Sequence, residues 1–575
     1  MLIGLDVGGT HTDAALLEPG NGRRATVVKA RTNPEDLLSG ILEALGELLR
    51  GKEPGRVRRL CVSTTLGLNA LLTGKGDRVG MLAVPGPGID PQVFWRPDPL
   101  FRVISGSQDH RGRIVAPPDE AEVTRVLREL LAEKVVAIGI VCKFSPKNPE
   151  MEHDLAAIAR KVCGDNMPVV LGCEVSGSLN FPRRLHTVWC NAALSGLGNS
   201  FIRSLLDGVS ALGLICPVTV LKADAGVFSA EQAARDPAST MGSGPAASLL
   251  GVWALSPENS GDTLMIDMGG TSTDLALLAG GIPLLAGKGL NVDERPTLIR
   301  SLWTRSIALG GDSVLRIADG APCIGTDCFR LAGDHVDADT APPTLTDALN
   351  VLGLTEFGDS SHSLRVMRAL AETAGTPESD PTALSDCFAL EALRIIRCQF
   401  DRLLEEVNAQ PVYTIRELLV NDTLQPQRAV FIGGPAKALA GKAENILGIP
   451  VLAPEESGCA NAVGAALALP TMTAELYADT LLGRMSIPEF GVSKAVGGGY
   501  TLAEAKKDMQ DAFSEAGARD AASSAAGCGT LLPAAAEQGA AQVVYAESFA
   551  MLDDGYKRGR VIRLRAQLSA GLLPL

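Results

Sequence analysis

The sequence predicts an α/β protein of two lobes, each built around one copy of the same glycine-rich hairpin. The first copy, Asp-Val-Gly-Gly-Thr-His-Thr-Asp, spans residues 6–13, and the second, Asp-Met-Gly-Gly-Thr-Ser-Thr-Asp, spans residues 267–274. Apolar runs precede and follow both copies, which indicates a strand, a tight turn and a second strand. Elsewhere, strand-like runs alternate with helical patterns, as in α/β folds. Because 575 residues exceed one core, the repeat favours two large lobes.

The composition predicts a globular protein that works in the cytoplasm. Hydrophobic residues make up 46% of the chain and charged residues 21%. The net charge of −14 argues against a nucleic acid or an anionic membrane as the main partner. No apolar run approaches the ~18 residues of a membrane helix, and we expect no signal peptide. Twelve scattered cysteines without a Cys-x-x-Cys motif are expected to be reduced thiols.

The first lobe is predicted over residues 1–190. Apolar runs of strand length alternate there with helical patterns, the strands at 58–63, 79–84, 135–142 and 168–172 and the helices near 35–50, 119–133 and 151–163. A long helix over residues 181–207 is expected to bridge the two lobes.

The second lobe is predicted over residues 191–470. Its expected elements are a strand at 218–221, a helix that starts in the turn 242–245, the second hairpin, a helix at 389–407 and a strand at 429–432. Residues 315–345 are rich in Gly, Asp and Pro, so we expect an irregular insertion or a substrate loop. Residues 471–575 form a C-terminal extension that is expected either to pack on the first lobe or to dock a partner.

The two hairpins are predicted to grip a polyphosphate from both sides. Glycines allow backbone angles and close approaches that a Cβ would forbid, and the hydroxyl groups add donors around an anion. Two unrelated Gly-Thr turns are the alternative interpretation, which the six shared positions of eight disfavour. The residues predicted to contact phosphate are Gly8, Gly9, Thr10, His11 and Thr12 in the first copy, and Gly269, Gly270, Thr271, Ser272 and Thr273 in the second.

Each copy opens with an acid at the end of its strand, and these acids are the predicted catalytic and metal-binding groups. Asp6 and Asp267 are placed to hold a hydrated Mg²⁺ or to orient a water, since Mg²⁺ prefers a few carboxylates plus phosphate oxygens. Asp13 and Asp274, which close the two copies, are catalytic candidates of a second tier.

Two further glycine-rich turns are candidates for ligand contact. Gly433, Gly434 and Pro435 follow an apolar strand, where the backbone could lie against an adenine or a ribose; an ordinary strand-to-helix turn is the alternative. Residues 242–245 are interpreted as a helix start with Pro245 as the first helical residue, and both an anion site and a plain helix start stay open.

Two Gly-Gly-Thr hairpins followed by a strand that ends in Gly-Gly resemble the superfamily of actin, sugar kinases and heat-shock chaperone ATPases. Within it, residues 2 to about 470 are similar to the A subunit of the hydantoinase and 5-oxoprolinase family, which includes subunits of acetone and acetophenone carboxylases. The segments that carry the resemblance are 63–72, 145–149, Arg184 with Thr187 and Asn191, 243–247, 343–348 and 433–436. The resemblance implies a two-lobed actin-like ATPase fold of the ribonuclease H-like type.

The chain departs from the family pattern at several places. Typical members have a histidine where this chain has Val62, and a His-Glu pair where it has Met151 and Glu152. His153 stands two positions late, and on a helix it would face about 200° away. A Gly-Gly-Gly-Ser segment of the family is replaced by residues 309–313. These changes leave the expected ATP site intact and alter residues near the expected substrate site.

The resemblance implies an enzyme that uses ATP and Mg²⁺ to phosphorylate the oxygen of a cyclic amide or imide, such as a hydantoin, 5-oxoproline or a lactam, before hydrolysis. It also implies a B-type partner subunit. An ATP-dependent ketone carboxylase subunit, an ATP-driven switch or reactivating ATPase acting on a protein partner, and a small-molecule kinase stay open as alternatives. The residues predicted to lie near the substrate are Thr64, Thr65, Asn69, Asp312 and Asp347.

Overall fold

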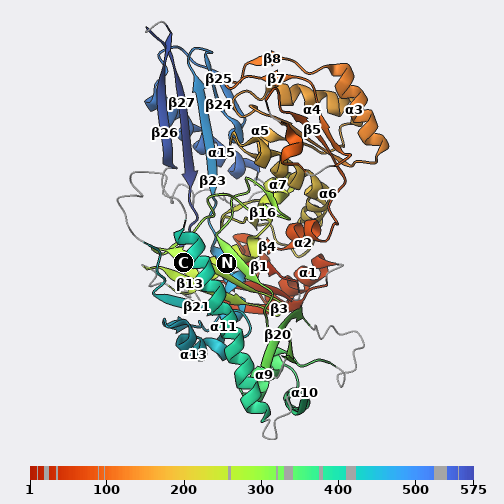
Figure 1. Ribbon diagram of the computed structural model, residues 1–575, viewed down its shortest axis with the longest axis vertical. Helices are drawn as coiled ribbons and strands as arrows, with labels where there is room; N and C mark the ends of the chain where they lie inside the picture. The colour runs from red at the N-terminus through yellow and green to blue at the C-terminus, as the bar shows by residue number, and fades with distance from the viewer. Residues whose placement is uncertain are drawn as a thin grey trace.

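The computed structural model confirms a mixed α/β architecture. It describes residues 1–9, 11–18, 25–33, 36–88, 90–95, 98–256, 261–318, 321–328, 341–373, 380–409, 423–523, 541–553 and 556–574. Figure 1 shows the sheets of the two hairpins in the lower half of the molecule, with a further α/β sheet and an antiparallel sheet above them. Among the described helices, none combines the length and the apolar character that a membrane span requires.

The first hairpin belongs to a six-stranded sheet in the order β12-β11-β4-β1-β2-β3. The strand β1 pairs antiparallel with β2 and parallel with β4, and β4 pairs parallel with β11. The strands are β1 (Leu2–Val7), β2 (His11–Leu17), β3 (Ala25–Arg31), β4 (Arg59–Thr64), β11 (Val218–Leu221) and β12 (Val227–Ser229). The helix α1 (Leu37–Leu48) packs on β1, β2 and β3.

The strands β11 and β12 lie within residues 191–470, where the second lobe is predicted, yet they complete the first sheet. The chain reaches them through α6 (Phe181–Ala211), which returns it to the edge of β4. A parallel strand needs such a crossover, and the sequence distance between β4 and β11 hides their pairing.

A second sheet of the amino-terminal half is entirely parallel, in the order β10-β9-β5-β6. Its buried central strands read as continuous apolar runs in the sequence, and this is why their positions could be predicted. Its strands are β5 (Val79–Val84), β6 (Phe101–Val103), β9 (Ala137–Cys142) and β10 (Val169–Leu171), and its helices α3 (Glu120–Ala132) and α4 (Glu150–Cys163) were also expected.

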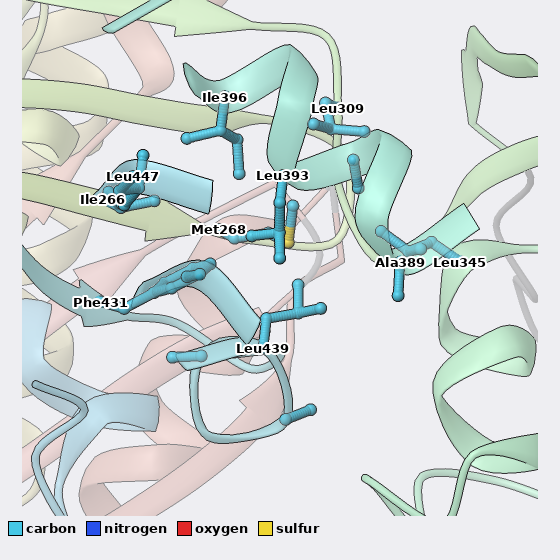
Figure 2. Close-up of a cluster of buried hydrophobic side chains, with 14 of the residues drawn as sticks. Ile266, Met268, Leu309, Leu345, Ala389, Leu393, Ile396, Phe431, Leu439 and Leu447 are labelled. Carbon is cyan, nitrogen blue, oxygen red and sulfur yellow. The ribbon is translucent and has the colours of Figure 1, made fainter. Parts of the chain in front are cut away.

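The second hairpin lies in a sheet that repeats the arrangement of the first. The strand β13 pairs antiparallel with β14 and parallel with β21, as β1 does with β2 and β4. Figure 2 shows side chains of β13 and β21, such as Met268 and Phe431, packed against Leu393 and Leu439 of the covering helices. The elements are β13 (Thr263–Met268), β14 (Thr273–Ala279), β18 (Thr304–Ile307), β21 (Arg428–Ile432), α11 (Pro381–Asn408) and α13 (Ala436–Leu447).

Residues 315–345 are not irregular throughout, so this expectation is wrong in part. The strands β19 (Ser313–Ala318) and β20 (Ala321–Cys328) form an antiparallel hairpin, and α9 (Leu345–Val351) begins where the segment ends. Val314, Leu315 and Ile317 supply the apolar side chains of a strand, but the surrounding Gly, Asp and Pro residues mask this signal in the sequence. Residues 329–340 lie outside the described part of the chain.

The C-terminal extension forms a five-stranded antiparallel sheet in the order β25-β24-β23-β27-β26. It lies beside first-lobe residues, with a bidentate pair of Arg111 and Asp479 at 2.7 and 2.8 Å and a bond from the Tyr477 hydroxyl to the carbonyl O of Gly177 at 2.9 Å. The elements are β23 (Met472–Asp479), β24 (Arg484–Ile487), β25 (Val492–Ala495), α15 (Leu502–Ser523), β26 (Gln542–Asp553) and β27 (Tyr556–Leu568).

Candidate active site

The two Gly-Gly-Thr hairpins share one turn hydrogen bond and one strand register. Gly8 N–H donates to the carbonyl O of His11 at 3.0 Å, and Gly269 N–H donates to that of Ser272 at 2.9 Å. The two acids of each copy also face one another across the strands, Asp6 opposite Asp13 and Asp267 opposite Asp274. The sequence repeat is therefore a structural repeat.

One asparagine joins the two repeats. The Nδ2 atom of Asn461 lies 3.1 Å from Oδ2 of Asp6 and 3.3 Å from Oδ2 of Asp267, so one amide donates to a carboxylate of each repeat. Asn461 lies in the first turn of α14 (Ala460–Leu467). Asn461 was not predicted as a site residue, because its signal in the sequence is no more than a polar amide within a run of small apolar residues.

Small residues allow α14 to reach this position between β1 and α8 (Ser243–Leu255). A Cβ on Gly4 of β1 would lie 1.9 Å from the carbonyl O of Ala462. A Cβ on Gly464 would lie 2.3 Å from the carbonyl O of Ala247, and one on Gly251 would lie 2.2 Å from that of Ala460. The helix backbones thus touch directly, which fixes Asn461 relative to both sheets.

The helix α8 supplies further support on each side. Ser248 Oγ donates to Oδ2 of Asp267 at 2.5 Å. The buried hydroxyl of Ser243 donates to the carbonyl O of Thr64 at 2.9 Å and accepts from the N–H of Thr64 at 3.1 Å. The expectation of a helix start is confirmed, but the helix begins at Ser243, two residues before Pro245, after Gly242 in a left-handed conformation with φ 93°.

The four acids share an environment that disfavours negative charge. The pKa of Asp6 and that of Asp274 are both raised to about 7. Burial is the largest cause, and the negative charge of nearby carboxylates raises both pKa values further. Burial also raises the pKa of Asp267 and of Asp13, although Lys29 forms an ion pair with Asp13 at 3.1 Å. A cation near Asp6 and Asp267 would relieve this repulsion.

The donor set fits Mg²⁺ better than a transition metal. Within the described residues, no group of three His, Cys, Asp or Glu side chains is arranged to hold an ion. Two converging carboxylates, with phosphate and water oxygens completing the shell, are what Mg²⁺ prefers, whereas Zn²⁺ sites use three or four protein ligands.

The predicted phosphate contacts fall into two groups. Gly9 and Gly269 are exposed at the turns, and His11, Thr271 and Ser272 are partly exposed. Thr12 and Thr273 are buried instead: Thr12 Oγ1 lies 3.0 Å from Thr32 Oγ1, and Thr273 Oγ1 donates to the carbonyl O of Leu309 at 2.7 Å. These two hydroxyls hold the hairpins in place in this structure, while Thr10 lies outside the described residues.

The turn at 433–435 lies against the second hairpin. Gly433 follows β21 with φ 93°, and a Cβ there would lie 2.1 Å from the carbonyl O of Met268 and 2.9 Å from Oδ1 of Asp267. Gly434 has open space around it, and Pro435 precedes α13. The structure therefore places these three residues beside the repeat that holds Asp267.

The candidate substrate residues do not form one group. The segment with Asp312 lies on the second hairpin, where Asp312 N–H donates to the carbonyl O of Gly270 at 2.7 Å. Thr344 is the N-cap of α9, and Asp347 forms a capping box with it. Asp347 also accepts a hydrogen bond from Ser363 Oγ at 2.7 Å, so its oxygens stabilise the local fold. Thr64 ends β4, close to the start of α8, while Thr65 precedes α2 (Leu66–Leu72) and Asn69 lies within it.

The positions of the missing family histidines lie in cores. Val62 is fully buried in β4, and Met151 is fully buried in α4. Glu152 accepts the N–H groups of Cys142 and Cys173, both at 2.7 Å, and it is also fully buried. The exposed His153 points out of this core, so it does not replace them there.

Comparison with known proteins supports this picture. Residues 2–163 match the family model described as hydantoinase/oxoprolinase N-terminal region, and residues 184–474 match that described as hydantoinase/oxoprolinase. The chain is 26% identical over 393 residues to caprolactamase subunit alpha of Pseudomonas jessenii, covering 62% of this chain and 55% of that protein. It is 27% identical over 408 residues to the acetophenone carboxylase gamma subunit of Aromatoleum aromaticum, covering 61% and 53%.

A solved structure extends the likeness to the whole chain. The ATP-dependent caprolactamase from Pseudomonas jessenii has a TM-score of 0.70 and 18% identity, covering 100% of this chain and 87% of that one, and at this identity the likeness shows the fold alone. The chain spans about half the length of the two curated subunits it matches. The family models match most of its residues, and they confirm the resemblance inferred from its motifs. The chain belongs to the hydantoinase/oxoprolinase family.

Proposed function

We propose that the protein uses ATP to activate the oxygen of a cyclic amide or imide by phosphorylation and then supports hydrolysis of the ring, as one subunit of a complex. The observation that carries the proposal is the convergence of Asp6 and Asp267 on Asn461, because it brings the acids of both hairpins to one point. Together with the family, it supports a two-lobed actin-like ATPase fold.

In this proposal the chain contributes positioning and charge stabilisation, which phosphoryl transfer mainly requires. The turns at Gly9 and Gly269 hold the phosphates, and the turn at Gly433 lies against the adenosine. Asp6 and Asp267 hold Mg²⁺, which would neutralise charge on the phosphates. The half-buried Asn461 and the buried Ser248 orient these carboxylates.

The reaction balances with two water molecules as the only other reactants. The amide oxygen attacks the γ-phosphorus of ATP, the bond to the bridging oxygen breaks, and ADP leaves. A first water adds to the activated carbon and the C–N bond breaks, which leaves an acyl phosphate; a second water then attacks its acyl carbon, and inorganic phosphate leaves with the oxygen of the amide. The products are an open-chain amino acid, ADP and phosphate, and the leaving phosphate explains why activation lowers the barrier for a stable lactam.

A partner subunit is part of the proposal. Both curated relatives are named as subunits, and the chain spans about half of their length. Activity of the isolated chain is therefore expected to include nucleotide turnover, and ring opening is expected to need the B-type subunit. A ketone carboxylase subunit is the second candidate, because the acetophenone carboxylase gamma subunit matches at similar identity.

Phosphate release from Mg-ATP tests the proposal, measured alone and with 5-oxoproline, hydantoins, lactams and ketones with bicarbonate. We expect a cyclic amide to stimulate release, and stimulation only by a ketone with bicarbonate would favour the carboxylase. Asp6→Asn and Asp267→Asn should each lower turnover by roughly a hundred-fold or more while the fold is retained. Asp154→Asn, at an exposed position of α4, serves as the control. Near-normal turnover in both site variants would refute the assignment.

A further inference from the structure

A cavity of about 1190 Å³ lies where three parts of the chain meet, apart from the nucleotide site. Its walls come from residues 168–199 of the amino-terminal half, the β11–β12 hairpin with α7 (Ala230–Arg235), residues 285–300 and the C-terminal sheet. No described residue of either Gly-Gly-Thr hairpin lines it, and neither does the turn at 433–435. Its volume is ample for a small ligand with water, since such pockets commonly measure about 300–1,000 Å³.

Cations outnumber acids along this wall, in contrast to the chain as a whole. The lining contains six Lys and Arg residues against five Asp and Glu residues, whereas the whole sequence has 52 basic and 66 acidic residues. The cations are Arg183, Lys222, Arg235, Lys288, Arg300 and Arg565.

The buried acids of the wall are already engaged by the protein. Both oxygens of Asp224 lie 2.8 Å from Thr471 Oγ1, and Oδ1 also accepts the N–H of Gly226. Glu475 accepts from the Tyr477 hydroxyl and from the guanidinium groups of Arg563 and Arg565. Their capacity to receive a donor from a ligand is therefore small.

Arg183, Lys222 and Arg300 keep N–H groups that can donate hydrogen bonds to a ligand. Lys222 and Arg300 share the carboxylate of Asp224, at 3.6 and 3.9 Å. Lys222 Nζ also donates to the carbonyl O of Thr471 at 2.8 Å and Arg300 Nη2 to Oε1 of Gln567 at 3.4 Å, so each cation retains at least one further N–H donor. The guanidinium of Arg183 donates through Nη1 to the carbonyl O of Thr297, three residues before Arg300. An Arg side chain has five N–H donors, so a bond to one carbonyl leaves Arg183 able to bind a carboxylate.

We propose that this cavity binds a small molecule that carries a carboxylate, with Arg183, Lys222 and Arg300 as the groups that hold it. Opening a cyclic amide creates a carboxylate, so the amino acid product belongs to this class; that identification rests on the proposed function, while carboxylate binding does not. The half-buried setting strengthens each charge-assisted bond relative to open solvent.

Isothermal titration of the nucleotide-free protein tests the proposal with 6-aminohexanoate, glutarate and the neutral lactam caprolactam. We expect both carboxylates to bind and caprolactam not to bind. Preference for 6-aminohexanoate would identify an amino acid ligand, and equal binding of glutarate would identify a general carboxylate site. Absence of carboxylate binding, or equal binding of caprolactam, would overturn the proposal.

Substitutions of the lining residues test whether the carboxylate binds in this cavity. Arg183→Gln and Arg300→Gln should each weaken carboxylate binding at least about five-fold, because each removes one charge-assisted bond. Arg128→Gln, on the exposed face of α3, is the matched control. The exposed Lys288→Gln provides a further test if an arginine variant does not fold. Unchanged binding in every foldable cavity variant would overturn the assignment.

One variant separates this proposal from the nucleotide site. Asp267→Asn should lose ATP turnover and keep carboxylate binding, because Asp267 does not line the cavity. Loss of carboxylate binding in Asp267→Asn would place the ligand at the nucleotide site and refute the proposal. Failure of every cyclic amide to stimulate ATP turnover would refute the proposed function, yet it would leave this titration unaffected.

Discussion

At the scale of single residues, Asn461 is a neutral group in an acidic setting. A lysine at this point would neutralise Asp6 or Asp267 and compete with a metal ion. The amide satisfies one oxygen of each carboxylate and leaves their negative charge available. Asn461 is therefore suited to hold the two carboxylates in place while an ion binds to their other oxygens.

We expect Asn461→Ala to raise the Mg²⁺ concentration for half-maximal nucleotide turnover by roughly ten-fold, as for other residues that orient metal ligands. Binding of Mg-ATP should weaken in calorimetry, while binding of metal-free ATP should change less. Asn199→Ala removes a helical amide bond on α6 and serves as the control. An unaltered Mg²⁺ requirement in Asn461→Ala would contradict this role.

The half-buried carboxylate of Asp274 predicts a dependence of stability on pH. Its folded pKa is about 7 against an ordinary value of 3.8, so the folded state retains a proton that the unfolded state has lost. The free energy of unfolding should then fall as pH rises from about 4 to 7. Asp274→Asn should remove on the order of 1–2 kcal/mol of this fall between pH 5 and pH 8, measured by denaturant unfolding without nucleotide. Parallel curves for variant and wild type would contradict the prediction.

At the scale of elements, the contact of α14 with β1 and α8 depends on missing side chains. We expect Gly464→Ala to destabilise the protein by about 2–4 kcal/mol, because the new Cβ meets backbone atoms of Ala247 and Gly251 at 2.3 Å. Gly441→Ala is the matched control, since Gly441 lies in α13 with nothing within 4 Å of the added Cβ, and it should stabilise by about 0.5–1 kcal/mol. Thermal unfolding of the two variants should move in opposite directions.

Elements whose signals are local could be predicted from the sequence. The buried strands β5 and β9 are apolar runs, and the two hairpins are short motifs that form from neighbouring residues. Asn461 could not be found in this way, because its two carboxylate partners lie 455 and 194 positions away. The pairing of β11 with β4 was missed for the same reason, and only the crossover through α6 reveals it.

At the scale of the whole molecule, the C-terminal sheet depends on a few polar contacts with the first lobe. We expect Arg111→Met to loosen this sheet by about 1–3 kcal/mol, because it leaves the buried carboxylate of Asp479 without its bidentate partner. Hydrogen exchange should then quicken in β23 and β24. Arg125→Met, which breaks an exposed pair with Glu129 on α3, should leave that exchange unchanged.

If the two hairpins were fully equivalent, a polyphosphate could lie between them in either of two opposite orientations. The strands beside them break this equivalence. Lys29 of β3 stands opposite Asp13, whereas the neutral Ser306 of β18 stands opposite Asp274. A glycine turn also follows only one of the two parallel strands beside the hairpins. Gly433 follows β21 and lies against the second copy, whereas β4, beside the first copy, leads into α2. A near-symmetric frame thus acquires a polarity, which under the proposed function would give a nucleotide one preferred orientation between the two hairpins.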